Sequence, residues 1–180
     1  TVNAILKTLF QKDSREENHS IRVGELCKLI GHAMGLSRAR TTDLALLGMI
    51  HDIGKISIDD NIIGKTEKLT SEEYDVIKRH SETGYHIISA SPELSYLSEY
   101  VLAHHERWDG NGYPNRIIGK DIPLFSRILA VADAYEAITS DRSYHKAKSS
   151  AEALAEIKRC SGTQFDPDIV DAFFKLMENK

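Results

Sequence analysis

The chain contains 180 residues, of which 41% are hydrophobic and 28% are charged, a balance typical of a single globular domain. No apolar run approaches the roughly 20 residues that a transmembrane helix requires, and residues 1–12 do not resemble a secretory signal. The formal net charge of −4 argues against a basic surface that binds nucleic acid. Cys27 and Cys160 form neither a CxxC pair nor a disulfide framework. We therefore expect a reducing, cytoplasmic compartment for this domain, even if the full-length protein is membrane-anchored.

The first predicted element is an amphipathic helix within residues 1–13. Its apolar positions recur at helical spacing, at Val2, Ile5, Leu6, Leu9 and Phe10. Such a short helix is marginal alone, so the apolar stripe must be buried. It either packs on its own domain or ends a signalling helix that joins a missing upstream sensor and pairs two chains into a homodimer. The chain does not begin with Met, so we expect a piece of a longer protein.

Residues 14–180 are predicted to form one all-α domain, because strand signals are nearly absent. A capping box at Ser14 and Glu17 opens a helix that stops at Gly35. The next helix is expected to stop near Gly54, and a loop follows to residue 69. Further helices are expected over residues 70–90, 92–105, 123–140, 151–158 and 168–177, with turn chemistry over residues 109–114.

Three ionisable side chains are expected to face the core. His19 shares a helical face with Val23, and Asp133 lies in an apolar segment. His80 lies one turn from Gly84, whose missing side chain leaves room for something bulky. A lone inward histidine is more often a hydrogen-bonded core residue than a ligand. A buried carboxylate, in contrast, needs a charged partner or a metal ion.

Two adjacent pairs, His51-Asp52 and His104-His105, fall at predicted helix ends. Neighbouring side chains on a helix point about 100° apart, so both members of a pair reach one centre only close to a helix end. With His19, His80 and Asp133, the pairs offer more ligands than one tetrahedral ion accepts. Imidazole and carboxylate suit Mn, Fe, Co, Ni or Zn. The pattern favours a two-metal site bridged by Asp52 over a structural zinc cluster, since no cysteine ligand is present.

From about Ser14 to Phe174 the chain resembles the HD-GYP subgroup of the HD phosphohydrolase superfamily. The motifs that carry the resemblance are His51-Asp52-Ile53-Gly54-Lys55, His104-His105-Glu106, Gly112-Tyr113-Pro114, Ala132-Asp133-Ala134 and Ser140-Asp141-Arg142. The resemblance implies a helical HD bundle in which residues 14–180 are the catalytic domain. It also implies hydrolysis of a 3′–5′ phosphodiester in cyclic di-GMP to linear pGpG, with GMP as an open further product.

The resemblance further implies roles for individual residues. The first metal would be held by His19, His51, Asp52 and Asp133, and the second by Asp52, His80, His104 and His105. The metals would be Fe or Mn, with Zn, Ni and Co as alternatives. Asp52 and Lys55 are the candidate catalytic residues, and the candidate substrate-binding residues are Lys55, Tyr113, Arg142 and Lys146. Lys55 and Arg142 could instead be ordinary surface or salt-bridging cations. The GYP loop (residues 112–114) could also contact a GGDEF-type partner.

Three departures from the family pattern bear on these expectations. Members that bind a third metal carry a Glu where this chain has Arg15, so we expect two metals. Ser81 replaces a common Pro, which matters little. His145 and Lys146 follow Tyr144, where a basic residue often comes directly after the Tyr, so substrate contacts there are in doubt. The alternatives are a cyclic-dinucleotide-binding module with little turnover, and another HD-superfamily nucleotide phosphohydrolase or a di-iron oxygenase.

Overall fold

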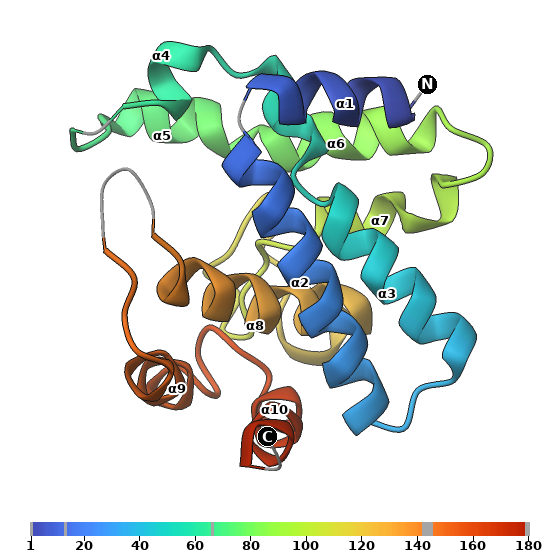
Figure 1. The fold of residues 1–180 in the computed structure, drawn as a ribbon, viewed down its shortest axis with the longest axis vertical. Helices are drawn as coiled ribbons and strands as arrows, with labels where there is room; N and C mark the ends of the chain where they lie inside the picture. The colour runs from blue at the N-terminus through green and yellow to red at the C-terminus, as the bar shows by residue number, and fades with distance from the viewer. Residues whose placement is uncertain (1, 13, 66, 142–145, 179–180) are drawn as a thin grey trace.

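The computed structural model describes residues 2–12, 14–65, 67–141 and 146–178 (Figure 1). Within these ranges the regular elements are helices, and the only β-type pairing is an isolated bridge between Ser161 and Phe165. The α-helices are α1 (Val2–Lys12), α2 (Ser14–Ala33), α3 (Arg38–Ile50), α4 (Asp60–Ile63), α5 (Ser71–Lys78), α6 (His80–Ser89), α7 (Ser98–Leu102), α8 (Leu124–Thr139), α9 (Ser150–Arg159) and α10 (Pro167–Glu178). The 3-10 helices are η1 (Ile53–Ser57), η2 (Ser95–Leu97) and η3 (Gly119–Asp121). The predicted all-α fold is confirmed, and none of the described helices is both long and apolar enough to cross a lipid bilayer.

The centre of the fold is formed by α2, which packs against both α3 and α8 (Figure 1). The predicted inward face of α2 is buried, and Val23 is fully inaccessible to solvent. The backbones of α2 and α3 approach so closely that a Cβ on Gly48 would lie 2.6 Å from the nitrogen of Gly24. This close approach fixes α2, which carries His19, against α3, which leads into His51.

The segment after α3 differs from the prediction. α3 ends at Ile50, close to the predicted end, but Gly54 lies inside η1 instead of stopping the helix. Only glycine fits at position 54, because the backbone of α6 lies directly against it. A Cβ on Gly54 would lie 1.9 Å from the backbone oxygen of His80 and 2.6 Å from the nitrogen of Gly84. The space that we expected Gly84 to leave for a bulky group is filled by Val101 and η1, because a Cβ on Gly84 would lie 2.9 Å from Cγ1 of Val101 and 3.6 Å from the nitrogen of Gly54. The predicted loop also contains α4, and the helix predicted over residues 92–105 is reduced to η2 and α7.

The helix predicted to begin at residue 70 is divided at Arg79 into α5 and α6. The imidazole Nδ1 of His80 lies 2.6 Å from the carbonyl oxygen of Ile77, and the hydroxyl of Ser81 donates to the carbonyl oxygen of Lys78 at 3.1 Å. These side chains compete with backbone N–H groups for the helix carbonyls. The competition explains the break, which makes His80 the first residue of α6.

The N-terminal helix α1 packs on its own domain, against α2 and η1. Ile5 and Leu6 of the predicted apolar stripe contact the hydrophobic core. At least part of the stripe is therefore buried within its own chain, as in the first of the two alternatives. The contact with η1 also brings α1 beside the short helix that carries Lys55.

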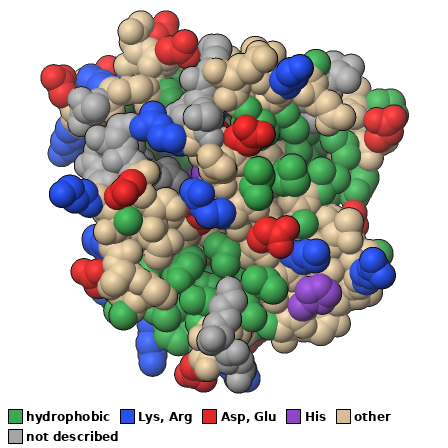
Figure 2. All heavy atoms as spheres, viewed as in Figure 1, with side chains coloured by type: hydrophobic (Ala, Val, Ile, Leu, Met, Phe, Trp, Pro, Cys, Tyr) green, Lys and Arg blue, Asp and Glu red, His purple; other side chains and the backbone are tan. Residues whose placement is uncertain are grey.

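The surface carries mixed charge. On the face shown in Figure 2, Lys and Arg side chains are interspersed with Asp and Glu side chains, and hydrophobic side chains gather between them. Ile21, Met49 and Ile118 are among the large hydrophobic residues that are exposed. Neither sign of charge dominates this face, in line with the net charge of −4.

Candidate metal centre

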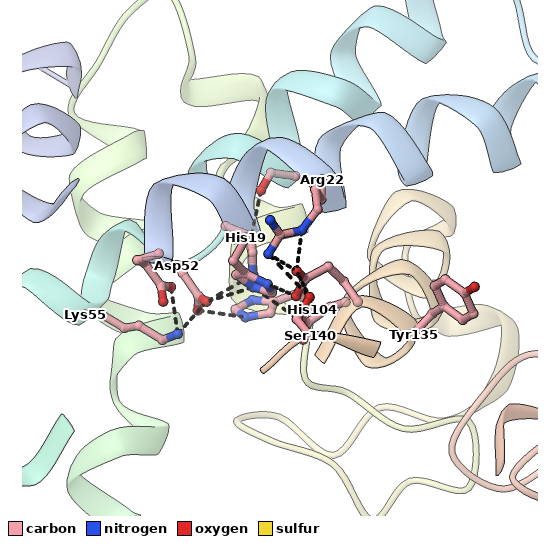
Figure 3. A network of polar contacts seen from close by, with 12 residues as sticks. His19, Arg22, Asp52, Lys55, His104, Tyr135 and Ser140 are labelled. Carbon is pink, nitrogen blue, oxygen red and sulfur yellow. Dashed lines mark hydrogen bonds and ion pairs between the residues drawn. The ribbon is translucent and has the colours of Figure 1, made fainter. Parts of the chain in front are cut away.

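The structure brings all seven predicted ligand residues together at one place. They come from the ends of several elements: His19 from α2, His51 and Asp52 from the end of α3, His80 from the start of α6, His104 and His105 from the turn after α7, and Asp133 from α8. Figure 3 shows His19, Asp52 and His104 facing one another. Of the seven ligand residues, His51, His80 and His104 have at most 2% of their surface exposed, whereas the side chain of Asp133 is 23% exposed and His105 is half-buried.

The ligand atoms fall into two groups that share Asp52. The potential ligand atoms of Asp52, His80, His104 and His105 all lie within 4.8 Å of one another, as do those of His19, His51 and Asp52. Oδ2 of Asp52 lies 3.1 Å from Nε2 of His51, whereas Oδ1 lies 3.3 Å from Nε2 of His80. Asp133 joins the former group, with its Oδ1 3.3 Å from Nε2 of His19. We call His19, His51, Asp52 and Asp133 the first ligand set and Asp52, His80, His104 and His105 the second ligand set.

The hydrogen bonds of the imidazoles fix which ring nitrogen faces the centre. Nδ1 lies 2.7 Å from the Gly48 carbonyl oxygen in His51, 2.6 Å from that of Ile77 in His80, and 2.5 Å from that of Val101 in His104. A carbonyl oxygen only accepts, so each Nδ1 carries the hydrogen and each neutral ring turns the lone pair of Nε2 inward. This orientation is the one that metal-binding histidines adopt.

Several of the inward nitrogens lie within 3.2 Å of a neighbouring one. Nε2 of His80 lies 3.2 Å from Nε2 of His104 and 3.1 Å from Nε2 of His105. Nε2 of His51 is buried and, among the described residues, has no hydrogen-bond partner. Because Nδ1 carries the hydrogen in both His80 and His104, their Nε2 lone pairs face each other and repel. The unpartnered buried Nε2 of His51 is also costly. The donor set therefore fits divalent metal ions.

The electrostatics of the two ligand sets differ. In the second set, burial lowers the pKa of His80 and His104, and burial together with the charge of His80 lowers the pKa of His105 to about 3. These rings are neutral near pH 7, the state that ligates metals. In the first set, burial lowers the pKa of His19, but Asp133 and nearby carboxylates outweigh burial and raise it to about 10. The first set thus favours positive charge at its centre.

The carboxylate of Glu136 is a functional candidate that the sequence analysis missed. It is buried on α8 and accepts hydrogen bonds from Nε of Arg22 at 2.7 Å and from the hydroxyl of Ser140 at 2.6 Å. It also contacts Nδ1 of His19, so it orients this ring as the carbonyl oxygens orient the others (Figure 3). Its spacing of three residues from Asp133 on one helix could have revealed it.

Lys55 lies at the edge of the centre. Its ammonium donates to Oδ2 of Asp52 at 2.6 Å and to Oε1 of Glu16 at 2.8 Å (Figure 3). Glu16 was also missed, although its position three residues before His19 on α2 puts both on one face. Arg15, on which the expectation of two metals was based, is exposed. The expectation of two metals rather than three stays a prediction.

The remaining predicted substrate residues lie farther out. The ring of Tyr113 packs against His105, with 4.9 Å between ring centroids. Lys146 is exposed and is not among the grouped metal-ligand candidates of the described residues. Arg142 lies outside the described residues. Of the four, Lys55 and Tyr113 thus border the metal centre.

Comparisons with known proteins identify relatives of the chain. A family model described as an HD domain matches residues 3–169. A cyclic di-GMP phosphodiesterase from Thermotoga maritima is 41% identical over 167 residues, which cover 92% of this chain and 45% of that protein. A 3′3′-cGAMP-specific phosphodiesterase from Vibrio cholerae is 35% identical over 161 residues, which cover 88% and 31%. The chain therefore spans less than half the length of either relative.

A solved structure supports the fold. The structure of an HDG"Y"P protein from Bdellovibrio bacteriovorus superposes with a TM-score of 0.72 and 16% sequence identity. The superposition covers 91% of this chain and 52% of that one. At this identity the likeness shows a shared arrangement of helices and nothing about the ligand.

Proposed function

The chain belongs to the HD domain family, and we propose that it is a metal-dependent phosphodiesterase that hydrolyses a 3′–5′ phosphodiester of cyclic di-GMP to linear pGpG. The observation that carries this proposal is the pair of ligand sets that share the carboxylate of Asp52. The identity of 41% with a cyclic di-GMP phosphodiesterase supports the choice of substrate. The seven ligand residues expected for a competent centre are present, which favours an enzyme over a module that only binds the nucleotide.

We infer that the first ligand set holds one divalent metal ion and the second ligand set holds another, with Fe or Mn preferred and Zn, Ni or Co as alternatives. When bound, such ions polarise phosphoryl oxygens and lower the pKa of water toward neutrality. The chain itself supplies the orientation, because each Nδ1 hydrogen bond described above fixes one imidazole ring. Glu136 adds a buried negative charge behind His19, which strengthens that ring as a ligand.

We infer that Lys55 binds a phosphoryl oxygen of the substrate. Its ammonium stays charged, because Asp52 and Glu16 outweigh burial and hold its pKa above the usual value for lysine. It lies between the buried Asp52 and the half-buried Glu16, and its side chain is 20% exposed. The ammonium of Lys55 can therefore bind an entering phosphate while it keeps its hydrogen bond to Glu16.

Another cyclic dinucleotide is a second candidate substrate, since the Vibrio cholerae relative is specific for 3′3′-cGAMP. Both nucleotides carry the same 3′–5′ linkage to the reacting phosphorus, so the metal centre alone does not distinguish them. Discrimination must come from contacts with the bases.

Product analysis tests the proposed function. The metal-loaded protein is incubated with cyclic di-GMP and, separately, with 3′3′-cGAMP, and the products are separated by chromatography. We expect linear dinucleotide from cyclic di-GMP, none after removal of metals with a chelator, and none from Asp52→Asn. Intact cyclic di-GMP after incubation with protein that binds it would instead favour the binding module.

We also propose that residues 1–13 carry a signal from an upstream sensor into residues 14–180, as one route to regulation. The contact of α1 with η1, which carries Lys55, supports this route. Oligomeric state and activity with and without residues 1–12 test it. If the intact chain and the shortened chain are both fully active monomers, the proposal fails.

A further inference from the structure

A groove with a volume of about 550 Å³ runs between α5 and the loop of residues 111–116. This volume lies within the range of small-molecule sites. The side chains that line it on the helix side belong to Tyr74, Asp75, Lys78, Arg79 and Glu82, and those on the loop side to Asn111, Tyr113, Pro114 and Arg116. Apart from Tyr113 and Pro114 of the GYP loop, none of these residues had been assigned a role.

Both walls of the groove extend from elements that carry the second ligand set. On the helix side, Arg79 immediately precedes His80. On the loop side, the ring of Tyr113 lines the groove and also packs against His105, 4.9 Å between centroids. Tyr113 therefore contacts both the groove and the metal centre.

The groove offers positive charge and an aromatic face. Lys78 is paired with Asp75 at 2.8 Å and lies over the ring of Tyr74. Arg79 and Arg116 are exposed. Together with Lys78 they outnumber Asp75 and Glu82, the two carboxylates that line the groove, by three charges to two. Guanidinium groups bind phosphates in a bidentate manner. Tyr74 is 48% exposed, and an exposed tyrosine ring can stack on a base.

The loop wall is held in place by the buried carboxylate of Glu106. Its Oε1 accepts hydrogen bonds from the backbone N–H groups of Asn115 at 2.7 Å and Arg116 at 3.1 Å. Gly112 packs so closely on the preceding turn that a Cβ would lie 2.4 Å from the nitrogen of Arg107. The guanidinium of Arg116 is thus presented from a backbone that is already ordered, which lowers the entropy cost of binding.

We propose that this groove binds the half of the cyclic dinucleotide that is not cleaved. Arg79 and Arg116 contact its second phosphodiester, and Tyr74 stacks on its base. The inference rests on the proposed function, and the ring of Tyr113, which packs on His105 and lines the groove, links the groove to the metal centre. The groove residues are then determinants of substrate specificity, while the metal centre acts on any accessible phosphodiester.

Activity assays with two substrates distinguish the contribution of the groove from that of the metal centre. Cyclic di-GMP needs both, whereas bis(p-nitrophenyl) phosphate is a phosphodiester without a second nucleotide. We expect Arg79→Gln and Arg116→Gln each to raise KM for cyclic di-GMP about tenfold. In each variant, kcat/KM for cyclic di-GMP should fall about tenfold more than kcat/KM for bis(p-nitrophenyl) phosphate. Tyr74→Ala should act similarly, and Tyr74→Phe should restore KM because stacking is kept. Lys120→Gln, which removes an exposed charge outside the groove, is the matched control.

Equal losses on both substrates, or an unchanged KM for cyclic di-GMP, would overturn the inference. The proposed function itself fails if the wild-type protein cleaves bis(p-nitrophenyl) phosphate but leaves cyclic di-GMP intact. In that case calorimetry with cyclic di-GMP and the same metal-loaded variants decides. A Kd raised about tenfold in the Arg variants supports the groove, whereas an unchanged Kd or no binding by the wild type refutes it.

Discussion

Substitution of Gly54 by Ala is predicted to disturb both stability and the metal centre. A Cβ at this position would lie 1.9 Å from the backbone oxygen of His80, although real Cβ contacts essentially never fall under 3.0 Å. The backbones of η1 and α6 must therefore separate by about 1 Å, and no rotamer change relieves the contact. Overpacking usually costs 1–3 kcal/mol, so we expect about 3 kcal/mol here. For a domain of this size, that lowers Tm by about 6–12 °C.

The assay is thermal unfolding of chelator-treated protein, followed by metal analysis of reloaded protein. Because the displaced α6 begins at His80, the variant should also lose metal from the second ligand set. Gly64→Ala is the matched control, since its new Cβ would meet only the oxygen of Asp60 at 3.0 Å, and its Tm should stay within about 3 °C. A wild-type Tm and metal content for Gly54→Ala would refute the reasoning about this close approach.

Three further changes test individual side chains. Glu136→Gln should lower metal affinity about 10- to 100-fold by weakening the imidazole behind it, and unchanged affinity in a competition titration would contradict this role. Glu16→Gln should raise KM for cyclic di-GMP about fivefold, with metal content unchanged, because Lys55 loses a partner that holds it in place. Glu17→Gln, at an exposed position, is the control, and an equal effect of both variants would contradict a role of Glu16 in positioning Lys55. The pKa of Asp109 is lowered to about 2 by the hydrogen bond from a neighbouring guanidinium, so this carboxylate stabilises the fold above its unfolded pKa and loses that effect as the pH falls toward 2. Urea unfolding should therefore show Asp109→Asn to be less stable by up to about 1 kcal/mol at pH 6 but not near pH 2, and a difference independent of pH would contradict the ion pair.

The sequence indicated the helices that position the centre because apolar residues recur at the helical period. The inward direction of His19 followed from its spacing to Val23, and the pairs His51-Asp52 and His104-His105 were recognisable by their place at helix ends. The division between α5 and α6 was not predictable from that periodicity. It depends on side chains near His80 that take helix carbonyls, which is a matter of local geometry.

Contacts between distant segments were harder to predict. Glu136 lies on the inward face of α8, but its pairing with His19, 117 positions away, requires the tertiary structure. Gly54 was interpreted as a helix stop, whereas its role is to let η1 approach α6. The groove beside Tyr113 also arises only when α5 and the 111–116 loop are brought together. Sequence periodicity describes one helix at a time and says little about which helices meet.

Metal stoichiometry tests the central claim most directly. Mass spectrometry of the reloaded protein should find two metal ions per chain in the wild type, one in His105→Ala and none or traces in Asp52→Ala, because Asp52 belongs to both ligand sets. Circular dichroism of each variant checks that the fold is retained. If a folded Asp52→Ala variant keeps two metal ions, or if the wild type binds a third, the account of a dinuclear centre bridged by Asp52 is wrong.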